Sequence, residues 1–280
     1  KIIKLIIKMK FAFSTNAYRK YSLEQSIVSI KNAGYSALEI MCDTPHAYPP
    51  LKDDRIKEIR KNLDENGMLI SNLNGFMLCA IQDFHHPSWI EDSSKFRSRR
   101  IEHTKNCIVL ADKLNAKTVS TEPGGPIIGT PKESDLTMFE NGINEVIPLL
   151  EKTGIKLLIE PEPDLLIENS GQFLEFIKRI DSKLVRLNFD IGHFYCVNED
   201  PAKLILKLER YIEHIHLEDI SKERVHNHLV PGQGVINFKK IFSNIKKINY
   251  NGFITIELYP YLEQPEIAAS DSLKYLKSIM

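Results

Sequence analysis

The sequence lacks the features that mark several large classes of protein. No Gly-x-Gly-x-x-Gly or phosphate-loop motif follows the first apolar segment, which disfavours a nucleotide-binding open sheet. The four cysteines, Cys42, Cys79, Cys107 and Cys196, form no Cys-x-x-Cys pair, so neither a disulfide framework nor a zinc ribbon is indicated. We therefore expect reduced thiols in a cytoplasmic protein.

Neither charge nor hydrophobicity points to nucleic acid or membrane as a partner. The 37 basic and 37 acidic residues give a formal net charge of zero, which predicts no overall attraction to polyanions. The apolar stretch within residues 1–10 is too short to cross a bilayer and lacks the longer apolar core of a signal peptide. We interpret residues 1–8 as an upstream extension or expression remnant, and residues 9–280 as a single domain.

Eight short apolar segments alternate with eight longer amphipathic segments along the chain. In one of the latter, Ile56, Ile59 and Leu63 recur at the spacing of one helix face. Eight strand–helix units in about 250 residues predict an α/β fold of the (β/α)8 TIM barrel type, with eight parallel strands and outer helices. The predicted strands are Phe11–Thr15, Ala37–Met41, Leu69–Leu73, Thr118–Thr121, Lys156–Ile159, Val185–Phe189, His214–Leu217 and Phe253–Leu258. The predicted helices are Ser22–Ala33, Asp53–Asn66, Ser94–Leu114, Asp135–Lys152, Gly171–Ile180, Pro201–Tyr211, Phe238–Ile248 and Gln264–Ile279.

Four consecutive predicted strands carry an acid or a histidine at the end where a barrel builds its active site. These residues are Glu160, Asp190, His216 and Glu257. Each alone could cap a helix or hydrogen-bond within the core. Asp190 and Glu257, however, lie between large apolar neighbours, where a charge is costly unless it is paired or binds a metal. Three carboxylates and one imidazole suit one divalent cation, namely manganese, magnesium, cobalt or zinc.

Five segments carry a family resemblance: IEPEP, NFDIGHFYC, HIHLEDI, RVHNHLVPGQG and TIELYP. Together they resemble the xylose-isomerase-like barrel superfamily, in its sugar phosphate isomerase/epimerase branch, over nearly the whole chain. The resemblance implies that Glu160, Asp190, His216 and Glu257 bind one divalent metal. It also implies a small-molecule sugar or sugar phosphate as the ligand. Barrels of this family commonly form homodimers, although no interface pattern is recognisable here.

The resemblance also implies which residues contact the substrate. His193, three residues after Asp190, matches a substrate-contacting histidine of the family, whereas Arg224 matches the family's loop arginine only approximately. Glu162 lies between two prolines that fix the direction of its side chain. It is interpreted as a contact or support of the substrate, with a loop salt bridge as the alternative. His228 is expected to touch the substrate or to hydrogen-bond within its loop.

The chemistry of these residues predicts a metal-dependent isomerase or epimerase. A metal that chelates a ketone and its neighbouring hydroxyl acidifies the proton on the carbon they share. Glu160 and Glu257 are the predicted catalytic acid and base on the two sides of the substrate. Return of the proton to the opposite face gives epimerisation, and return to the neighbouring carbon gives isomerisation. A dehydratase or lyase acting on a sugar-like substrate is the alternative, and a non-catalytic barrel is disfavoured because all four ligands are present.

The same superfamily includes apurinic endonucleases, which cut phosphodiesters with a multi-zinc cluster. His193, His226 and His228 match part of that pattern, but the ligand that should end the third strand is absent and Glu122 replaces the fourth-strand ligand. The phosphodiesterase is therefore disfavoured. A second, incomplete metal site of Glu122, His226 and His228 is an alternative to substrate contact by the two histidines.

A long irregular stretch follows the third predicted strand, from residue 74 to about residue 93. A loop of that length in a compact domain is usually functional. It contains Trp89, the only tryptophan, which is predicted either to stack on an apolar sugar face as part of a lid or to anchor the loop together with Phe84. No strong phosphate-binding motif is present, so the phosphorylation state of the substrate stays open.

Overall fold

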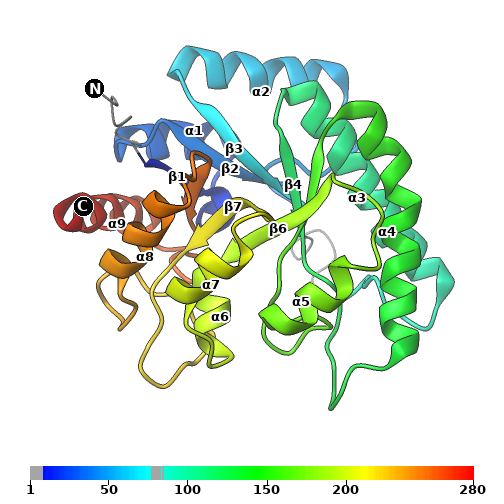
Figure 1. The fold of residues 1–280 in the computed structure, drawn as a ribbon. Helices are drawn as coiled ribbons and strands as arrows, with labels where there is room; N and C mark the ends of the chain where they lie inside the picture. The colour runs from blue at the N-terminus through cyan, green and yellow to red at the C-terminus, as the bar shows by residue number, and fades with distance from the viewer. Residues whose placement is uncertain (1–8, 77–82, 84) are drawn as a thin grey trace, which may run out of the picture.

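The computed structural model describes residues 9–76, 83 and 85–280 of the chain. These residues form a closed barrel of eight parallel strands in sequence order, so the predicted (β/α)8 fold is confirmed. Figure 1 shows the strands at the centre of the molecule with helices around them. The prediction for residues 1–8 and that for Phe84 lie outside the described residues. The strands are β1 Lys10–Ser14, β2 Ala37–Met41, β3 Leu69–Asn74, β4 Thr118–Thr121, β5 Lys156–Ile159, β6 Val185–Asp190, β7 Ile212–Leu217 and β8 Phe253–Ile256.

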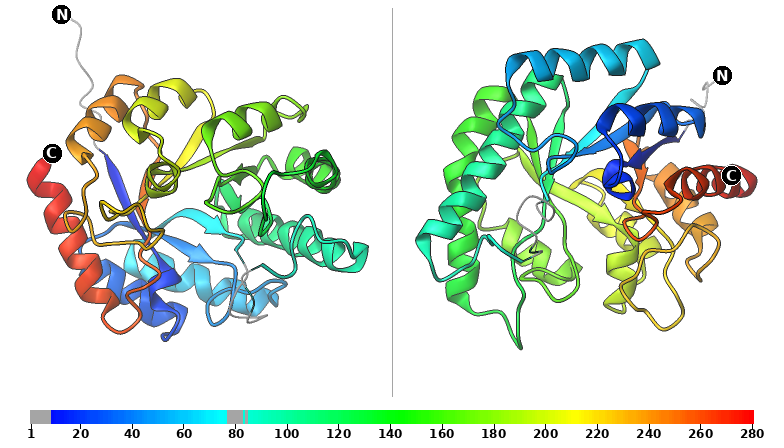
Figure 2. Two further views of the ribbon diagram at one scale, coloured as in Figure 1. Left: turned by 90° about the horizontal axis from the view of Figure 1, so that it is seen from below. Right: turned by 180° about the vertical axis from the view of Figure 1, so that it is seen from behind.

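Helices surround the sheet on its outside, and β1 pairs with both β2 and β8 to close the barrel (Figure 2). The helical segments are η1 Thr15–Tyr18, α1 Leu23–Asn32, α2 Asp53–Asn66, α3 Ser94–Leu114, α4 Glu133–Thr153, α5 Ser170–Ile177, α6 Ile191–Cys196, α7 Pro201–Leu208, α8 Phe238–Lys247 and α9 Pro265–Ile279. No helix within the described ranges combines the length and apolar character needed to cross a membrane.

Two of the predicted site residues lie at equivalent places on the barrel rim. Glu160 is the first residue after β5, and its backbone N–H donates to the Thr121 carbonyl at 3.0 Å. Glu257 is the first residue after β8, which ends two residues earlier than predicted, and its backbone N–H donates to the Leu217 carbonyl at 3.2 Å. A backbone bond to the preceding strand therefore anchors each glutamate just beyond the sheet.

The short helix α6, which the sequence pattern did not predict, begins directly after Asp190. The Oδ1 atom of Asp190 accepts a hydrogen bond from the His193 backbone at 2.7 Å, so this carboxylate is both a strand end and a helix cap. Gly192 is required by packing, because a Cβ atom there would collide with the Glu218 carboxyl group. This tight turn places His193 at the same mouth of the barrel as Asp190.

The interior of the barrel contains a buried column of polar side chains. Ser71 Oγ lies 3.0 Å from Thr255 Oγ1, which lies 2.7 Å from His214 Nε2. His214 Nδ1 lies 2.8 Å from Asn188 Oδ1, and the amide nitrogen of Asn188 donates to Glu160 Oε2 at 2.8 Å. Buried polar groups are tolerated when hydrogen-bonded, and a connected network holds its members in one arrangement. The column thus positions Glu160 from below.

Candidate active site and metal centre

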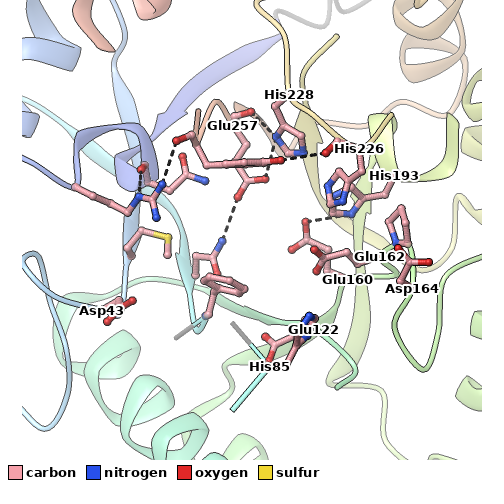
Figure 3. Close-up of a pocket in the computed structure, with 17 residues that line it drawn as sticks. Asp43, His85, Glu122, Glu160, Glu162, Asp164, His193, His226, His228 and Glu257 are labelled. Atoms are coloured by element: carbon pink, nitrogen blue, oxygen red, sulfur yellow. Dashed lines mark hydrogen bonds and ion pairs between the residues drawn. The ribbon is translucent and has the colours of Figure 1, made fainter. Parts of the chain in front are cut away.

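A cavity of about 480 Å³ opens at the carboxyl ends of the strands (Figure 3). This is the end of the barrel where the sequence placed its acids and histidines. The predicted site residues that line the cavity are Glu122, Glu160, Glu162, His193, His226, His228 and Glu257. Side chains from separate strands therefore meet around one space large enough for a small molecule.

The structure brings the four predicted metal ligands together. Glu160, Asp190, His216 and Glu257 are buried, and one ligand atom of each lies within 4.8 Å of the others. His216 Nδ1 lies 2.8 Å from Glu160 Oε1, 3.5 Å from Glu257 Oε2 and 3.8 Å from Asp190 Oδ2.

The charges of this group fit a divalent cation. The group itself contains three carboxylates and one imidazole, His216, and within the described ranges the only basic side chains within 4.0 Å of these carboxylates are histidines, not lysine or arginine. Buried negative charge in this excess is costly without a further positive charge. An oxygen-rich set with one nitrogen suits manganese, magnesium, cobalt or zinc.

Glu39, which the sequence analysis missed, supports His216 from below. The Nε2 atom of His216 lies 2.8 Å from Glu39 Oε2, and the Asn72 amide donates to the same oxygen at 2.8 Å. Burial works to raise the pKa of Glu39, but the charge and hydrogen bond of His216 lower it to about 2. A carboxylate behind a metal-binding histidine fixes the orientation of the ring and raises its basicity. The sequence signal that could have identified Glu39 is an acid placed within the apolar segment that forms β2, all of whose residues are buried.

The acids around His216 determine its protonation. Burial lowers the pKa of His216, but the nearby carboxylates of Glu160, Glu39 and Glu257 raise it well above its ordinary value. Without a cation, the ring is therefore an imidazolium between Glu160 on Nδ1 and Glu39 on Nε2. A metal ion that binds Nδ1 has to displace a proton from that nitrogen.

Metal affinity is accordingly expected to rise with pH. Below the raised pKa of His216, the cation competes with a proton, so the affinity should fall about tenfold for each pH unit of acidification when one proton is released. Calorimetric titration with Mn²⁺ in buffers of different ionisation enthalpy counts the protons released. Binding that is independent of pH between about pH 6 and about pH 8, with no proton release, would contradict the assignment of Nδ1 as a ligand.

Burial also perturbs the pKa values of the carboxyl groups that face the cavity. It raises the pKa of Glu160, and it raises that of Glu257 well above the ordinary range, in both cases against the opposing effect of His216. Burial and the neighbouring Glu160 raise the pKa of Glu162 strongly as well. Carboxyl groups shifted in this direction are the ones that can exchange protons near neutral pH.

Glu218 is a further buried acid close to Asp190, and it is the first residue after β7. Burial and the charge of Asp190 raise the pKa of Glu218 well above its ordinary value. Its position explains why α6 needs a glycine, since the Glu218 carboxyl packs against Gly192.

Three imidazoles gather on one wall of the cavity. One ring nitrogen from each of His193, His226 and His228 lies within 4.8 Å of the others. His193 Nδ1 lies 3.0 Å from the Pro161 carbonyl, and His228 Nδ1 lies 2.8 Å from the Glu257 carbonyl. Because a carbonyl only accepts, both rings carry their proton on Nδ1 and keep a lone pair on Nε2. Burial lowers the pKa of all three rings, so they act as neutral acceptors.

Glu122 does not join those histidines. Its Oε1 atom forms a buried ion pair with Arg100 Nη2 at 2.6 Å. Within the described residues it belongs to none of the groups whose ligand atoms could share one ion. The predicted second metal set of Glu122, His226 and His228 is therefore not assembled, because α3 delivers Arg100 to the end of β4.

Trp89 and Arg224, for which contact with substrate was predicted, are not among the described residues that line the cavity. Trp89 is 1% exposed, and its indole N–H donates to Thr121 Oγ1 at 3.0 Å behind the wall. It anchors the long loop, as the alternative interpretation held. Arg224 lies 3.9 Å over the ring of Tyr195 and donates to the carbonyl of the same residue. Its guanidinium is thereby used to hold the loop against α6.

Other residues that line the cavity were not found from the sequence. Asn16 and Arg19 come from the turn after β1, Asp43 follows β2, and Tyr259 follows β8. Each lies shortly after a strand end, which is a positional signal. Their residue types, however, do not distinguish them from ordinary loop residues.

Comparison with known proteins places the chain in a family. Residues 27–279 match the family described as the xylose isomerase-like TIM barrel. The chain belongs to this family. Among curated relatives of this xylose isomerase-like barrel, inosose dehydratase of Clostridium botulinum is 26% identical, over 92% of this chain and 90% of that protein. Fructoselysine 3-epimerase of Shigella flexneri is 23% identical, over 97% of this chain and 98% of that protein.

Solved structures agree with the fold of this xylose isomerase-like barrel. A D-tagatose 3-epimerase-like protein is 26% identical and superposes with a TM-score of 0.79, covering 97% of this chain and 98% of its own. The IOLI protein, solved with a zinc atom bound, superposes with a TM-score of 0.80 at 19% identity, covering 97% and 98% of the two chains. The relatives thus include both epimerases and a dehydratase.

Proposed function

We propose that this protein is a metal-dependent epimerase or isomerase that moves a proton on the carbon next to a sugar carbonyl. The observation that carries the proposal is the placement of Glu160 and Glu257 around one ion site. They follow β5 and β8, which approach the site from opposite sides with β6 and β7 between them. Two carboxylates so placed can address the two faces of one carbon atom.

Glu160, Asp190, His216 and Glu257 would hold one divalent ion, either manganese, magnesium, cobalt or zinc. The structurally similar IOLI protein was solved with a zinc atom bound, which supports a divalent cation as a ligand of this barrel. When bound, the ion would polarise a carbonyl and its neighbouring hydroxyl and so acidify the proton between them. Glu39 and Asn188 hold His216 and Glu160 in place for this purpose.

In the proposed reaction, one glutamate takes the carbon-bound proton and the other supplies a proton. The electron pair left on carbon passes into an enediolate, so the charge moves to oxygen. A proton returned to the opposite face gives the epimer, and one returned to the adjacent carbon gives the isomer. The positions of Glu160 and Glu257, directly after β5 and β8 at one ion site, support both roles.

The imidazole wall is assigned to the substrate. His193 and His228 line the cavity, and the unprotonated Nε2 atom of His193 would accept a hydrogen bond from a sugar hydroxyl. Glu162, which lines the same wall, would contact a hydroxyl beside the reacting carbon. A measured content of two metal ions per chain would instead indicate an ion among His193, His226 and His228, and would favour the phosphodiesterase.

A dehydratase on a sugar-like substrate is the second candidate, favoured by the likeness to inosose dehydratase. It would begin with the same proton removal, after which a hydroxyl leaves from the neighbouring carbon as water. The product is then an enone, which absorbs ultraviolet light. The positions of the Glu160 and Glu257 carboxylates are compatible with dehydration as well as with epimerisation or isomerisation.

The test is deuterium incorporation from D₂O. The protein loaded with Mn²⁺ is incubated with free ketohexoses and with an inosose, and carbon-bound deuterium is followed by NMR. We expect exchange next to the carbonyl, its loss on chelation and its return when Mn²⁺ is added back. Metal-dependent turnover without any solvent deuterium would rule out the proton-transfer mechanism, and a new ultraviolet absorbance would identify the dehydratase.

A further inference from the structure

We infer that Asn74 is a positioning residue for the proposed reaction, which holds the carboxylate of Glu257 in the orientation in which that group can act as a base. The inference rests on the proposed function, since it concerns the same glutamate, and it assigns a role to the last residue of β3. It follows from the contacts of the two Glu257 oxygens, from the way in which Asn74 is itself fixed, and from the same arrangement at Glu160.

The two carboxylate oxygens of Glu257 face different partners. Oε2 lies 3.5 Å from His216 Nδ1 and 3.7 Å from His228 Nδ1, so it is the oxygen on the side of the histidines. Oε1 accepts a hydrogen bond from the Asn74 side-chain amide, whose Nδ2 atom lies 3.4 Å away. The terminal torsion of a glutamate is only loosely restricted by its own side chain, so this amide is what selects one orientation. A carboxylate oxygen has two lone pairs, and Oε1 can therefore keep this bond while it takes a proton from carbon.

Asn74 presents its amide nitrogen to Glu257 because its other polar atoms are engaged elsewhere. Its Oδ1 atom accepts a hydrogen bond from the Phe76 backbone N–H at 3.0 Å, which turns the Nδ2 atom toward Glu257. Its backbone carbonyl accepts from the Cys42 N–H at 2.8 Å. The residue is only 5% exposed, although it lines the cavity. Asn74 is thus a fixed donor at the edge of the site.

The backbone just after Asn74 is held by helix α3. The carbonyl of Gly75 accepts from Arg100 Nη1 at 3.2 Å and lies 3.1 Å from His103 Nε2. The N–H of Gly75 donates to the Ser120 carbonyl at 2.9 Å. A Cβ atom at this position would lie 2.8 Å from the same Ser120 oxygen, so the close approach of the two backbones requires glycine. These contacts keep the end of β3 from shifting relative to Glu257.

Glu160, the other proposed base, has the same pair of contacts. Its Oε1 atom lies 2.8 Å from His216 Nδ1, and its Oε2 atom accepts from the Asn188 amide at 2.8 Å. Each proposed base therefore turns one oxygen toward His216 and gives the other to an asparagine amide. A connected hydrogen-bond network of this kind holds its members in one arrangement. Asn188 does this from the barrel interior and Asn74 from the rim.

The test compares deuterium exchange from D₂O in the two epimers of a ketohexose that the wild-type protein interconverts, at saturating Mn²⁺. Glu257→Gln first identifies the epimer whose exchange depends on Glu257. Asn74→Ser shortens the side chain so that it no longer reaches Glu257, while its hydroxyl can still accept from the Phe76 N–H. We expect exchange of the Glu257-dependent epimer to fall about tenfold or more, because the base loses its fixed orientation. Exchange of the other epimer should stay unchanged.

Two further variants separate positioning from packing. Asn74→Ala should show the same selective loss as Asn74→Ser, and it carries the test if the serine variant does not fold. Normal exchange in Asn74→Ser together with a loss in Asn74→Ala would mean that only the turn to Phe76 matters, which overturns the inference. Asn62→Ser is the matched control, since the Asn62 amide donates to the Glu58 carbonyl on α2 and its loss should change neither rate.

Other outcomes overturn the inference in recognisable ways. Equal slowing of both epimers in Asn74→Ser would indicate a general structural role, and a higher KM with an unchanged kcat would indicate a substrate contact. Competition with a chelator gives the Mn²⁺ affinity without reference to activity, and it should fall by less than about tenfold. A larger fall would make Asn74 a support of the ion site instead. Absence of exchange in the wild-type protein counts against the proposed function itself.

Discussion

Replacing Glu257 with glutamine is expected to lower the rate of epimerisation by about 10²- to 10⁴-fold, and Glu160→Gln should do the same. The amide cannot accept a proton from carbon, although it fills nearly the same space. Both residues also belong to the ion site, so part of the loss could come from weaker metal binding. Metal content is therefore measured on each variant, and rates are compared at saturating Mn²⁺.

The two glutamine variants should differ in which epimer still exchanges deuterium, and weaker metal binding would not produce this difference. If one glutamate serves each face of the carbon, Glu160→Gln should still exchange deuterium into one epimer and Glu257→Gln into the other, without interconverting them. Asp190→Asn is the matched control, since Asp190 is assigned to metal binding alone and its loss should depress exchange with both epimers together. Equal residual exchange of both epimers in both glutamine variants would refute the assignment of two opposed bases.

Glu39→Gln is expected to weaken metal binding by about 10- to 100-fold, although Glu39 faces His216 from the side away from the ion site. Glutamine can still accept the hydrogen bond from His216 Nε2, but it removes the charge that makes the ring a stronger ligand. Competition with a chelator of known affinity gives the dissociation constant directly, without reference to activity. Glu213→Gln, a glutamate of β7 outside the metal group, provides the control.

An unchanged metal affinity in Glu39→Gln would mean that the backbone and Asn188 suffice to orient His216. A structural defect alone would lower the melting temperature of the metal-free protein without changing the affinity of the fraction that stays folded. Measuring both quantities therefore separates a positioning role of Glu39 from a contribution to folding.

The convergence of the four proposed metal ligands could be predicted from the sequence by two simple rules. Strand–helix alternation predicts a parallel barrel, and parallel strands all end at the same rim. Glu160, Asp190, His216 and Glu257 each end one of four successive strands, so the local pattern alone predicts that they converge. The structure places them together within 4.8 Å.

The role of Glu39 could be predicted only in part from the sequence. Its charge within the apolar strand β2 signals a buried partner, but nothing in the pattern identifies His216 as that partner. The two strands are not neighbours in the barrel, and their side chains meet only because the barrel closes.

By itself, the sequence determined the barrel and the four side chains at its rim, because hydrophobic periodicity and strand ends are local properties. Only the tertiary structure decided that Glu122 pairs with Arg100, that Trp89 lies behind the wall and that Arg224 stacks on Tyr195. These contacts depend on how α3 and the loops after the strands pack against the barrel. That packing is set by the shapes of distant surfaces, which no local pattern encodes.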